Sequence, residues 1–123
     1  MQTDVRMIQL LMELRRQGIT DTDVLSAMET TPREFFVPAV FQDRAYDNVA
    51  LPIDAGQTIS QPYVVAYMTA ALELKPTNRV LEVGTGTGYQ TAILAKLARR
   101  IYTVERHASL AEQAQDRLKK LKL

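Results

Sequence analysis

Three glycines alternate with threonines at residues 84–88, directly after the apolar run at residues 79–83 and before a helix-like stretch that begins at Tyr89. Glycine allows a sharp backbone turn and lets a ligand approach where a Cβ would collide. The start of a helix presents unpaired N–H groups and the positive end of its dipole. A strand, a glycine turn and a helix start in this order predict a cradle for a cofactor.

Two acids flank the glycines. Glu82 lies inside the end of the first apolar run, and Glu105 follows the second run, residues 100–104, at 21 positions after Gly84. An acid about 20 residues after the first glycine, at the tip of the next strand, is placed to accept hydrogen bonds from ribose hydroxyls. Glu105 is therefore predicted to bind a nucleoside.

The spacing of the glycines distinguishes between nucleotides. A dinucleotide site favours G-x-G-x-x-G, whereas here Tyr89 stands at the position of the third glycine, which disfavours NAD or FAD. No lysine follows the glycines, so a P-loop is excluded. The pattern Glu82-x-Gly84-x-Gly86-x-Gly88 resembles the first motif of class I S-adenosylmethionine methyltransferases instead.

The elements that position these residues follow from apolar spacing. Helical periodicity predicts a first helix from about Val5 to Gln17 and a second one, capped by Thr20 or Asp21, that ends before Pro32. Residues 31–61 have no sustained period, but their aromatic side chains indicate a packed, irregular segment.

A third helix is expected to begin at Pro62, a favoured first helical residue. Its apolar face is predicted to hold Val64, Val65, Met68, Ala71 and Leu72. We then expect a strand at 79–83, a helix at 88–98, a strand at 101–105 and a helix at 108–121. The alternation predicts an α/β fold with two parallel strands.

Bulk composition bounds the class of protein. The chain has 123 residues, 46% of them hydrophobic and 24% charged, with a net charge of +1, which is typical of one soluble globular domain and gives no reason to expect a nucleic-acid or membrane partner. There is no cysteine and one histidine, so disulfides are excluded and no metal site is expected. A cytoplasmic location is the default expectation.

Three segments indicate which reaction is catalysed, namely residues 32–38, 56–62 and 79–90. Together they closely resemble protein-L-isoaspartate O-methyltransferases, in the family's own order through nearly the whole chain. The run Thr58-Ile59-Ser60-Gln61-Pro62 is much more specific than the glycines. The resemblance implies methyl transfer from S-adenosylmethionine to the α-carboxylate of L-isoaspartyl residues in damaged proteins, a repair reaction.

The resemblance also assigns residues. It places the active-site serine at Ser60, with Thr58 and Ile59 in the same loop. It places cofactor contacts at the following positions: Gln57, Glu82, Gly84, Thr85, Gly86, Gly88 and Glu105. Without it, a serine two residues before Pro62 is better explained as a helix N-cap, and the two roles are compatible.

The family's enzymes are longer, with a seven-stranded sheet, and the resemblance covers only their N-terminal portion. It implies a partial Rossmann-like methyltransferase fold: residues 1–61 form N-terminal helices and an irregular substrate segment, and residues 62–123 form the first half of the cofactor domain. We expect a truncated form with open sheet edges, which self-associates and is impaired or inactive.

Three other hypotheses stay open at this point. A class I methyltransferase with another acceptor would keep the cofactor and change the substrate. A non-catalytic, self-associating half-fold would keep the architecture without transfer. Half of an NAD-type dehydrogenase is disfavoured by Tyr89.

Overall fold

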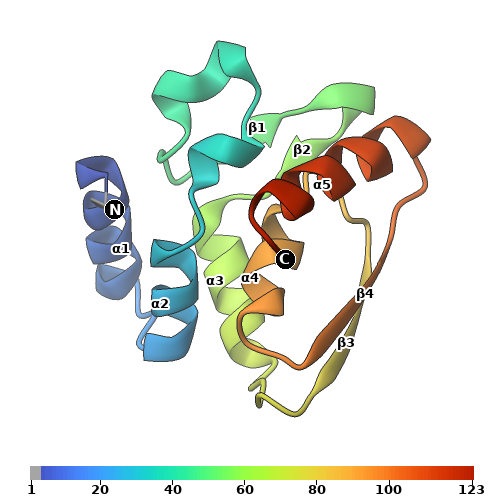
Figure 1. Ribbon diagram of the computed structural model, residues 1–123. Coiled ribbons are helices and arrows are strands. Elements are labelled where there is room, and N and C mark those ends of the chain that lie inside the picture. The colour runs from blue at the N-terminus through green and yellow to red at the C-terminus, as the bar shows by residue number, and fades with distance from the viewer. Residues whose placement is uncertain (1–3) are drawn as a thin grey trace.

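The computed structural model describes residues 4–123 (Figure 1). Helices α1 (Val5–Arg16) and α2 (Thr22–Glu29) lie on one side of the molecule, and the parallel strands β3 (Arg79–Val83) and β4 (Arg100–Val104) lie on the other. Helices α3 (Pro62–Ala71) and α4 (Tyr89–Ala95) lie between them, and α5 (Ala108–Lys120) follows β4. No helix within this range has both the length and the apolar character needed to cross a membrane.

The first two helices begin where the sequence indicates, and α1 ends at Arg16, one residue before its predicted end. Asp4 caps α1 by accepting from the backbone N–H of Arg6, and Gly18 follows the helix with a φ of 100°. Asp21 caps α2, accepting from the N–H groups of Asp23 and Val24. Of the two caps considered for this helix, Asp21 is therefore the one used, and such a cap contributes about 1 kcal/mol.

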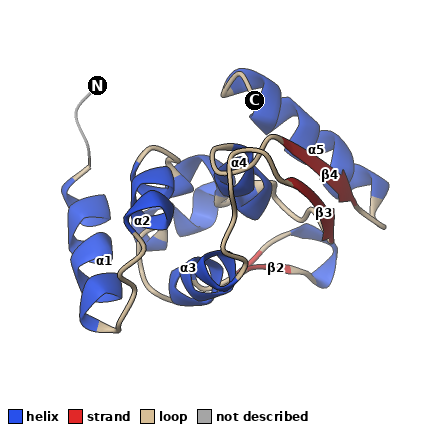
Figure 2. Ribbon diagram, turned by 90° about the horizontal axis from the view of Figure 1, so that it is seen from below, coloured by secondary structure: helices blue, strands red, loops and turns tan. Residues whose placement is uncertain are grey.

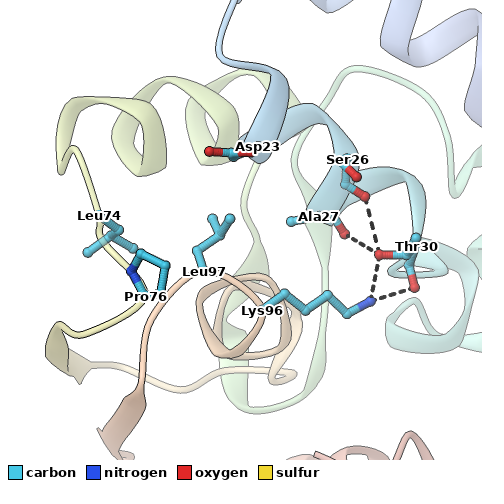
Figure 3. Close-up of a pocket in the computed structure, with 8 residues that line it drawn as sticks. All are labelled: Asp23, Ser26, Ala27, Thr30, Leu74, Pro76, Lys96 and Leu97. Carbon is cyan, nitrogen blue, oxygen red and sulfur yellow. Dashed lines mark hydrogen bonds between the residues drawn. The ribbon is translucent and has the colours of Figure 1, made fainter.

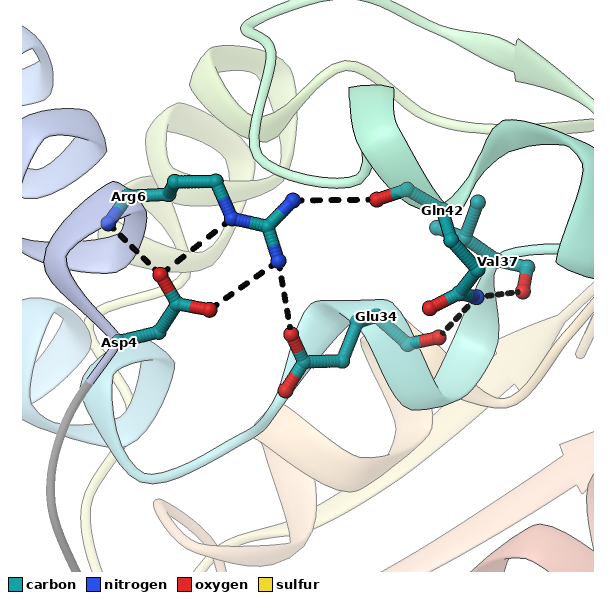
Figure 4. A network of polar contacts seen from close by, with 5 residues as sticks. All are labelled: Asp4, Arg6, Glu34, Val37 and Gln42. Atoms are coloured by element: carbon teal, nitrogen blue, oxygen red, sulfur yellow. Dashed lines mark hydrogen bonds and ion pairs between the residues drawn. The ribbon is translucent and has the colours of Figure 1, made fainter.

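A polar network attaches α1 to the irregular segment (Figure 4). The guanidinium of Arg6 pairs with Asp4 at 3.1 Å and with Glu34 at 3.2 Å, and donates to the carbonyl of Gln42 at 3.1 Å. The amide of Gln42 donates to the carbonyls of Glu34 and Val37. The segment is thus held by directional contacts although it has no regular period.

Residues 31–61 are ordered but irregular, as predicted. They form three short 3-10 helices, η1 (Arg33–Phe36), η2 (Ala39–Arg44) and η3 (Asp54–Gly56), and a small antiparallel pair, β1 (Leu51–Pro52) with β2 (Thr58–Ile59). The hairpin was not predicted, because two-residue strands are too short to show an alternating pattern. Phe36 and Tyr46 are buried, which confirms that the aromatic side chains of this segment pack in the core.

Helix α3 begins at Pro62 as predicted, but its predicted apolar face is wrong. Only Val65 of that face is buried, and the side chains that actually pack inward are Pro62, Val65, Ala66 and Thr69. Val64, Met68 and Leu72 are exposed. Because apolar residues surround almost the whole of α3, their spacing does not select one face, and packing against α2 and α4 decides the rotation.

Strands β3 and β4 pair in parallel over their full length, with Arg79 opposite Arg100 and Val83 opposite Val104. Helix α5 lies next to β4 in Figure 2, and its Ala114 faces Gly88 at the start of α4. The α/β class and the parallel pair are thus confirmed. The core draws side chains from Met7 to Ile93, so both predicted segments contribute to it, and their division at residue 61 stays a prediction.

Helix α4 ends at Ala95, three residues before its predicted end. The backbone N–H groups of Lys96 and Leu97 bond to carbonyls only three residues back, which tightens the last turn. Arg99 then donates its N–H to the carbonyl of Asn78, beside the start of β3. The helix must end early because the chain has to enter β4 at Arg100.

One face of the β3–β4 pair is open. Its apolar side chains, which we call the open sheet face, are all exposed, and they are Leu81, Val83, Tyr102 and Val104. Val80, Glu82, Ile101 and Thr103 alternate with them and are half-buried. The predicted open sheet edges are therefore accompanied by an exposed apolar face.

Candidate functional site

The glycine turn, residues 84–88, connects β3 to α4. All three of its glycines have positive φ, at 91° for Gly84, 57° for Gly86 and 91° for Gly88, a region that other residues avoid. The N–H of Gly84 donates to the carbonyl of Val104 at 2.8 Å, so the turn starts while still paired to β4. This turn chemistry fixes the loop at the carboxyl ends of both strands.

Glu105 braces the turn from the end of β4. Its two carboxylate oxygens accept from the backbone N–H groups of Gly86 and His107, each at 2.9 Å. These two backbone hydrogen bonds lower the pKa of Glu105 below its usual value. A carboxylate has about four acceptor sites, so Glu105 can hold the turn and still accept from a ligand hydroxyl.

Glu82 lies near the end of β3, just before the turn, and it is half-buried. Its Oε1 accepts from the hydroxyls of Thr91 and, at 2.7 Å, Thr103. Since the single proton of the Thr103 hydroxyl is used, Thr85 donates to Thr103 at 2.5 Å. Burial raises the pKa of Glu82, with the two threonine bonds opposing it. Its Oε2 has no hydrogen-bond partner among residues 4–123 and can accept from a ligand.

The three glycines have different surroundings. A Cβ at Gly84 or Gly86 would meet nothing within 4 Å, so open space lies over the first half of the turn. A Cβ at Gly88 would come within 3.3 Å of the Cβ of Ala114 on α5. The first two glycines therefore leave room for a ligand, whereas Gly88 allows α4 and α5 to approach each other.

The acceptor loop, residues 57–61, contains the predicted catalytic residues. Thr58 and Ser60 are exposed, whereas Ile59 between them is buried in the core. Gln57 is exposed and its amide donates to the carbonyl of Ala55. Ile59 anchors the loop, and its two hydroxyl neighbours face outward.

Ser60 does not cap α3. The N-cap position belongs to Gln61, and the side chain of Asn48 accepts from the N–H of Tyr63 at 2.9 Å, in place of a local cap. The Ser60 hydroxyl has no hydrogen-bond partner among the residues that the structure describes, and it is exposed. The cap explanation for Ser60 is therefore wrong, and its hydroxyl stays available to a substrate.

Arg33 connects the acceptor loop to the glycine turn. Its Nη2 donates to the carbonyl of Ser60 at 3.0 Å, and its guanidinium carbon lies 4.9 Å from the ring centre of Tyr89, which directly follows Gly88. Both predicted bends thus lie within the reach of one side chain. Sequence reasoning missed Arg33 and Asn48, because both act on backbone groups distant in the sequence.

A separate pocket of about 290 Å³ lies at the other end of α4 (Figure 3). There the amine of Lys96 donates to the carbonyl and the hydroxyl of Thr30, and burial lowers its pKa. The pocket is lined by Asp23, Ser26, Ala27, Thr30, Leu74, Pro76, Lys96 and Leu97. It takes no part in the candidate site, which lies at the amino end of α4.

Within residues 4–123, no group of three or more acidic and histidine side chains could hold a metal ion.

Comparisons with known proteins agree on one family. Residues 5–123 match the family model described as protein-L-isoaspartate(D-aspartate) O-methyltransferase. A protein-L-isoaspartate O-methyltransferase of Maricaulis maris is 58% identical over 120 residues, covering 98% of this chain and 56% of the relative. One from Sodalis glossinidius is also 58% identical over 120 residues, covering 98% of this chain and 58% of the relative.

Solved structures give the same result. A crystal structure of a protein-L-isoaspartate O-methyltransferase from Plasmodium falciparum, in complex with S-adenosyl-L-homocysteine, superposes with a TM-score of 0.79 at 29% identity, covering 94% of this chain and 58% of that one. Another structure with that enzyme name has a TM-score of 0.84 at 26% identity, with coverages of 95% and 39%. The chain spans little more than half the length of the curated relatives, and matches their N-terminal part.

Proposed function

The chain belongs to the protein-L-isoaspartate O-methyltransferase family, and we propose that its residues serve methyl transfer from S-adenosylmethionine to the α-carboxylate of L-isoaspartyl residues in damaged proteins. The glycine turn would hold the methyl donor and the acceptor loop the isoaspartyl carboxylate. The observation that carries this proposal is the open space over Gly84 and Gly86 together with the Ser60 hydroxyl, which is unpaired among residues 4–123. Arg33 joins the loop of Ser60 to Tyr89, which directly follows the turn.

The chain's own groups suit the donor. Gly84 and Gly86 let the ligand lie against the backbone of the turn, with Thr85 between them. Glu105 accepts from ribose hydroxyls, and the free Oε2 of Glu82 orients the amino-acid tail, directly or through water. Gly88 completes the turn, and Gln57 is proposed to contact the cofactor from the acceptor loop.

The acceptor needs alignment more than activation. A carboxylate is already ionised at neutral pH, so no strong general base is required. When bound, the cofactor supplies an electrophilic methyl group whose bond to sulfur breaks as the carboxylate oxygen bonds to carbon. Ser60 and Thr58 donate hydrogen bonds that hold the carboxylate in line with that bond, and buried Ile59 keeps the loop in place.

We expect the 123 residues alone to be impaired. Gly84 is exposed, and nothing within residues 4–123 lies close over the first half of the turn, so water would reach the reacting groups. We further propose that this chain self-associates through the open sheet face. The cytoplasmic location expected from the composition stays a prediction.

Binding is tested first, by calorimetry with S-adenosylhomocysteine and with NAD on the purified chain. We expect heat with the first ligand and none with the second, because the turn lacks a third glycine at Tyr89. Binding of NAD alone would overturn the cofactor proposal. Binding of S-adenosylhomocysteine by a chain that never transfers a methyl group would favour a non-catalytic half-fold.

Transfer is tested with a radiolabelled methyl group and two peptides that differ only in an isoaspartyl or a normal aspartyl residue. We expect slow labelling of the isoaspartyl peptide alone. Ser60→Ala should lower that rate at least about tenfold, the usual effect of losing a hydrogen bond to a charged group. An unchanged rate in Ser60→Ala would remove Ser60 from the catalytic assignment, and labelling of other acceptors only would favour a different methyltransferase.

A further inference from the structure

Arg33 is the least expected side chain in the core. It is 0% exposed, although arginine is among the residue types almost never fully buried without an ionic partner. No carboxylate lies within ion-pair distance of it among residues 4–123. Burial lowers its pKa, opposed by Tyr89, yet a guanidinium stays charged in proteins.

The polar contacts of Arg33 are to backbone on both sides of the hairpin. Its Nη2 donates to the carbonyl of Val49 at 3.3 Å and to that of Ser60 at 3.0 Å. Val49 precedes β1 and Ser60 follows β2, so a single nitrogen joins the two ends of the hairpin that carries the acceptor loop. This contact fixes the position of the loop relative to η1.

The guanidinium of Arg33 also contacts the helix that follows the glycine turn. It lies over the ring of Tyr89, the first residue of α4, and that ring packs edge-on against Phe36 at 5.5 Å between ring centres. A cation over a buried aromatic face is attracted by the ring quadrupole. The ring therefore places Arg33, and through it the base of the acceptor loop, beside the glycine turn.

Stability alone does not account for this arrangement. Arg33 Nε and Nη1 and the hydroxyl of Tyr89 are buried and make no hydrogen bond of normal geometry, so the attraction between the guanidinium and the hydroxyl offsets their burial only in part. An apolar side chain of similar length would fill the same space without that cost. What the guanidinium adds is direction, since the two in-plane hydrogens of Nη2 point to the two backbone carbonyls.

From these contacts, and resting on the proposed function, we infer that Arg33 is a positioning residue for methyl transfer. It sets the acceptor loop relative to the glycine turn, through the carbonyls of Val49 and Ser60 on one side and the ring of Tyr89 on the other. Because Arg33 is fully buried, this role needs no contact with substrate or cofactor and works through the placement of Ser60.

Hydrogen exchange on the ligand-free chain tests the placement, whether or not the chain is active. In Arg33→Met, the amides of residues 49–61 should exchange roughly tenfold faster or more, whereas those of α1 should not change. In Arg33→Lys, which retains one charged donor, the exchange rate at residues 49–61 should fall between those of wild type and Arg33→Met. An unchanged rate at residues 49–61 in both variants would overturn the inference, and if Arg33→Met does not fold, Arg33→Lys and Tyr89→Leu decide it.

Arg6 offers a matched control on the far side of the same segment. Its guanidinium carbon also lies 4.9 Å from a tyrosine ring centre, that of Tyr46, and it also donates to a backbone carbonyl. Arg6→Met should leave exchange at residues 49–61 at the wild-type rate. Equal acceleration in Arg6→Met and Arg33→Met would show a general loosening of the segment and would contradict the inference.

The link to methyl transfer has its own readout. In Arg33→Met we expect labelling of the isoaspartyl peptide to fall by a larger factor than S-adenosylhomocysteine affinity, because only the proposed contact of Gln57 joins the loosened loop to the cofactor, and we expect partial recovery in Arg33→Lys. If the wild-type chain binds no S-adenosylhomocysteine, the proposed function fails and the exchange result still decides the placement. Equal loss of cofactor affinity and transfer would contradict a role through Ser60.

Discussion

The acid at the tip of β4 has one role that the structure shows and one that we propose. Glu105 is predicted to bind ribose, and in this structure both of its oxygens already accept from backbone N–H groups, those of Gly86 and His107. The same carboxylate therefore shapes the turn before any ligand arrives. A side chain assigned to a ligand can be as important for preparing the site as for contacting the ligand.

This double role predicts a pH dependence of stability. The pKa of Glu105 is lowered by its backbone hydrogen bonds, so its contribution is fully present above the unfolded-state pKa of about 4.3 and is lost as the pH falls through the folded-state pKa. Glu105→Gln should thus be less stable than wild type at pH 7, and the difference should shrink in more acidic solution. Urea unfolding at neutral and acidic pH measures both.

Glu112→Gln is the matched control, since Glu112 is exposed on α5 and its carboxylate has no hydrogen-bond partner among the described residues. Its unfolding free energy should follow wild type at both pH values. A difference between Glu105→Gln and wild type that stays constant from neutral to acidic pH would show that the carboxylate charge does not hold the turn.

At the scale of elements, the glycine turn combines an open surface, where we propose that the ligand binds, with a helix contact. Gly84 and Gly88 have the same φ of 91°, yet one faces open space and the other faces Ala114. A side chain introduced at Gly84 or at Gly88 meets the same backbone strain but different surroundings. Comparing the two positions therefore separates the strain from the effect of the surroundings. Gly88 allows the packing of α4 on α5, and the cofactor contact at Gly84 stays a proposal.

Alanine at each position should give different results. Gly84→Ala should cost only the strain of left-handed backbone, about 1–2 kcal/mol, while its Cβ enters the proposed cofactor space and weakens S-adenosylhomocysteine binding. Gly88→Ala adds a tight contact to the same strain and should cost about 1 kcal/mol more. Chemical unfolding and calorimetry on both variants measure this, and equal unfolding free energies would show that α5 simply moves aside.

At the scale of the whole molecule, the open sheet face sets the behaviour of the chain in solution. Val83 is 81% exposed on a strand edge that no third strand covers within residues 4–123, and Leu81, Tyr102 and Val104 lie beside it. A contiguous apolar face next to unpaired backbone groups is an association site. The proposed self-association rests on this face.

Sedimentation equilibrium at tens of micromolar protein tests the proposed self-association. Wild type should sediment above its monomer mass of 13.9 kDa, and Val83→Lys should shift the equilibrium towards monomer because a charge would be buried on association. Val40→Lys is the control, since Val40 is 76% exposed on η2, away from the sheet. A monomeric wild type, or equal effects of the two lysines, would contradict the proposal.

Much of the fold could be predicted because its signals are local. Asp21 and Pro62 mark helix starts by chemistry within one turn, and the run at residues 79–83 matches β3 at both ends. The rotation of α3 and the early end of α4 could not be predicted, since both depend on neighbours distant in the sequence. The hairpin β1–β2 was missed because two residues carry no period.

The candidate site divides in the same way. The sequence alone determined the residue types and the order of the glycine turn, the acids and the acceptor loop, because turns and strand ends are specified by adjacent residues. Only the tertiary structure decided that Ser60 is no cap, that Gly88 packs on Ala114 and that Arg33 connects the two loops. Contacts between residues 26 to 56 positions apart depend on how the core packs, and no local pattern encodes that packing.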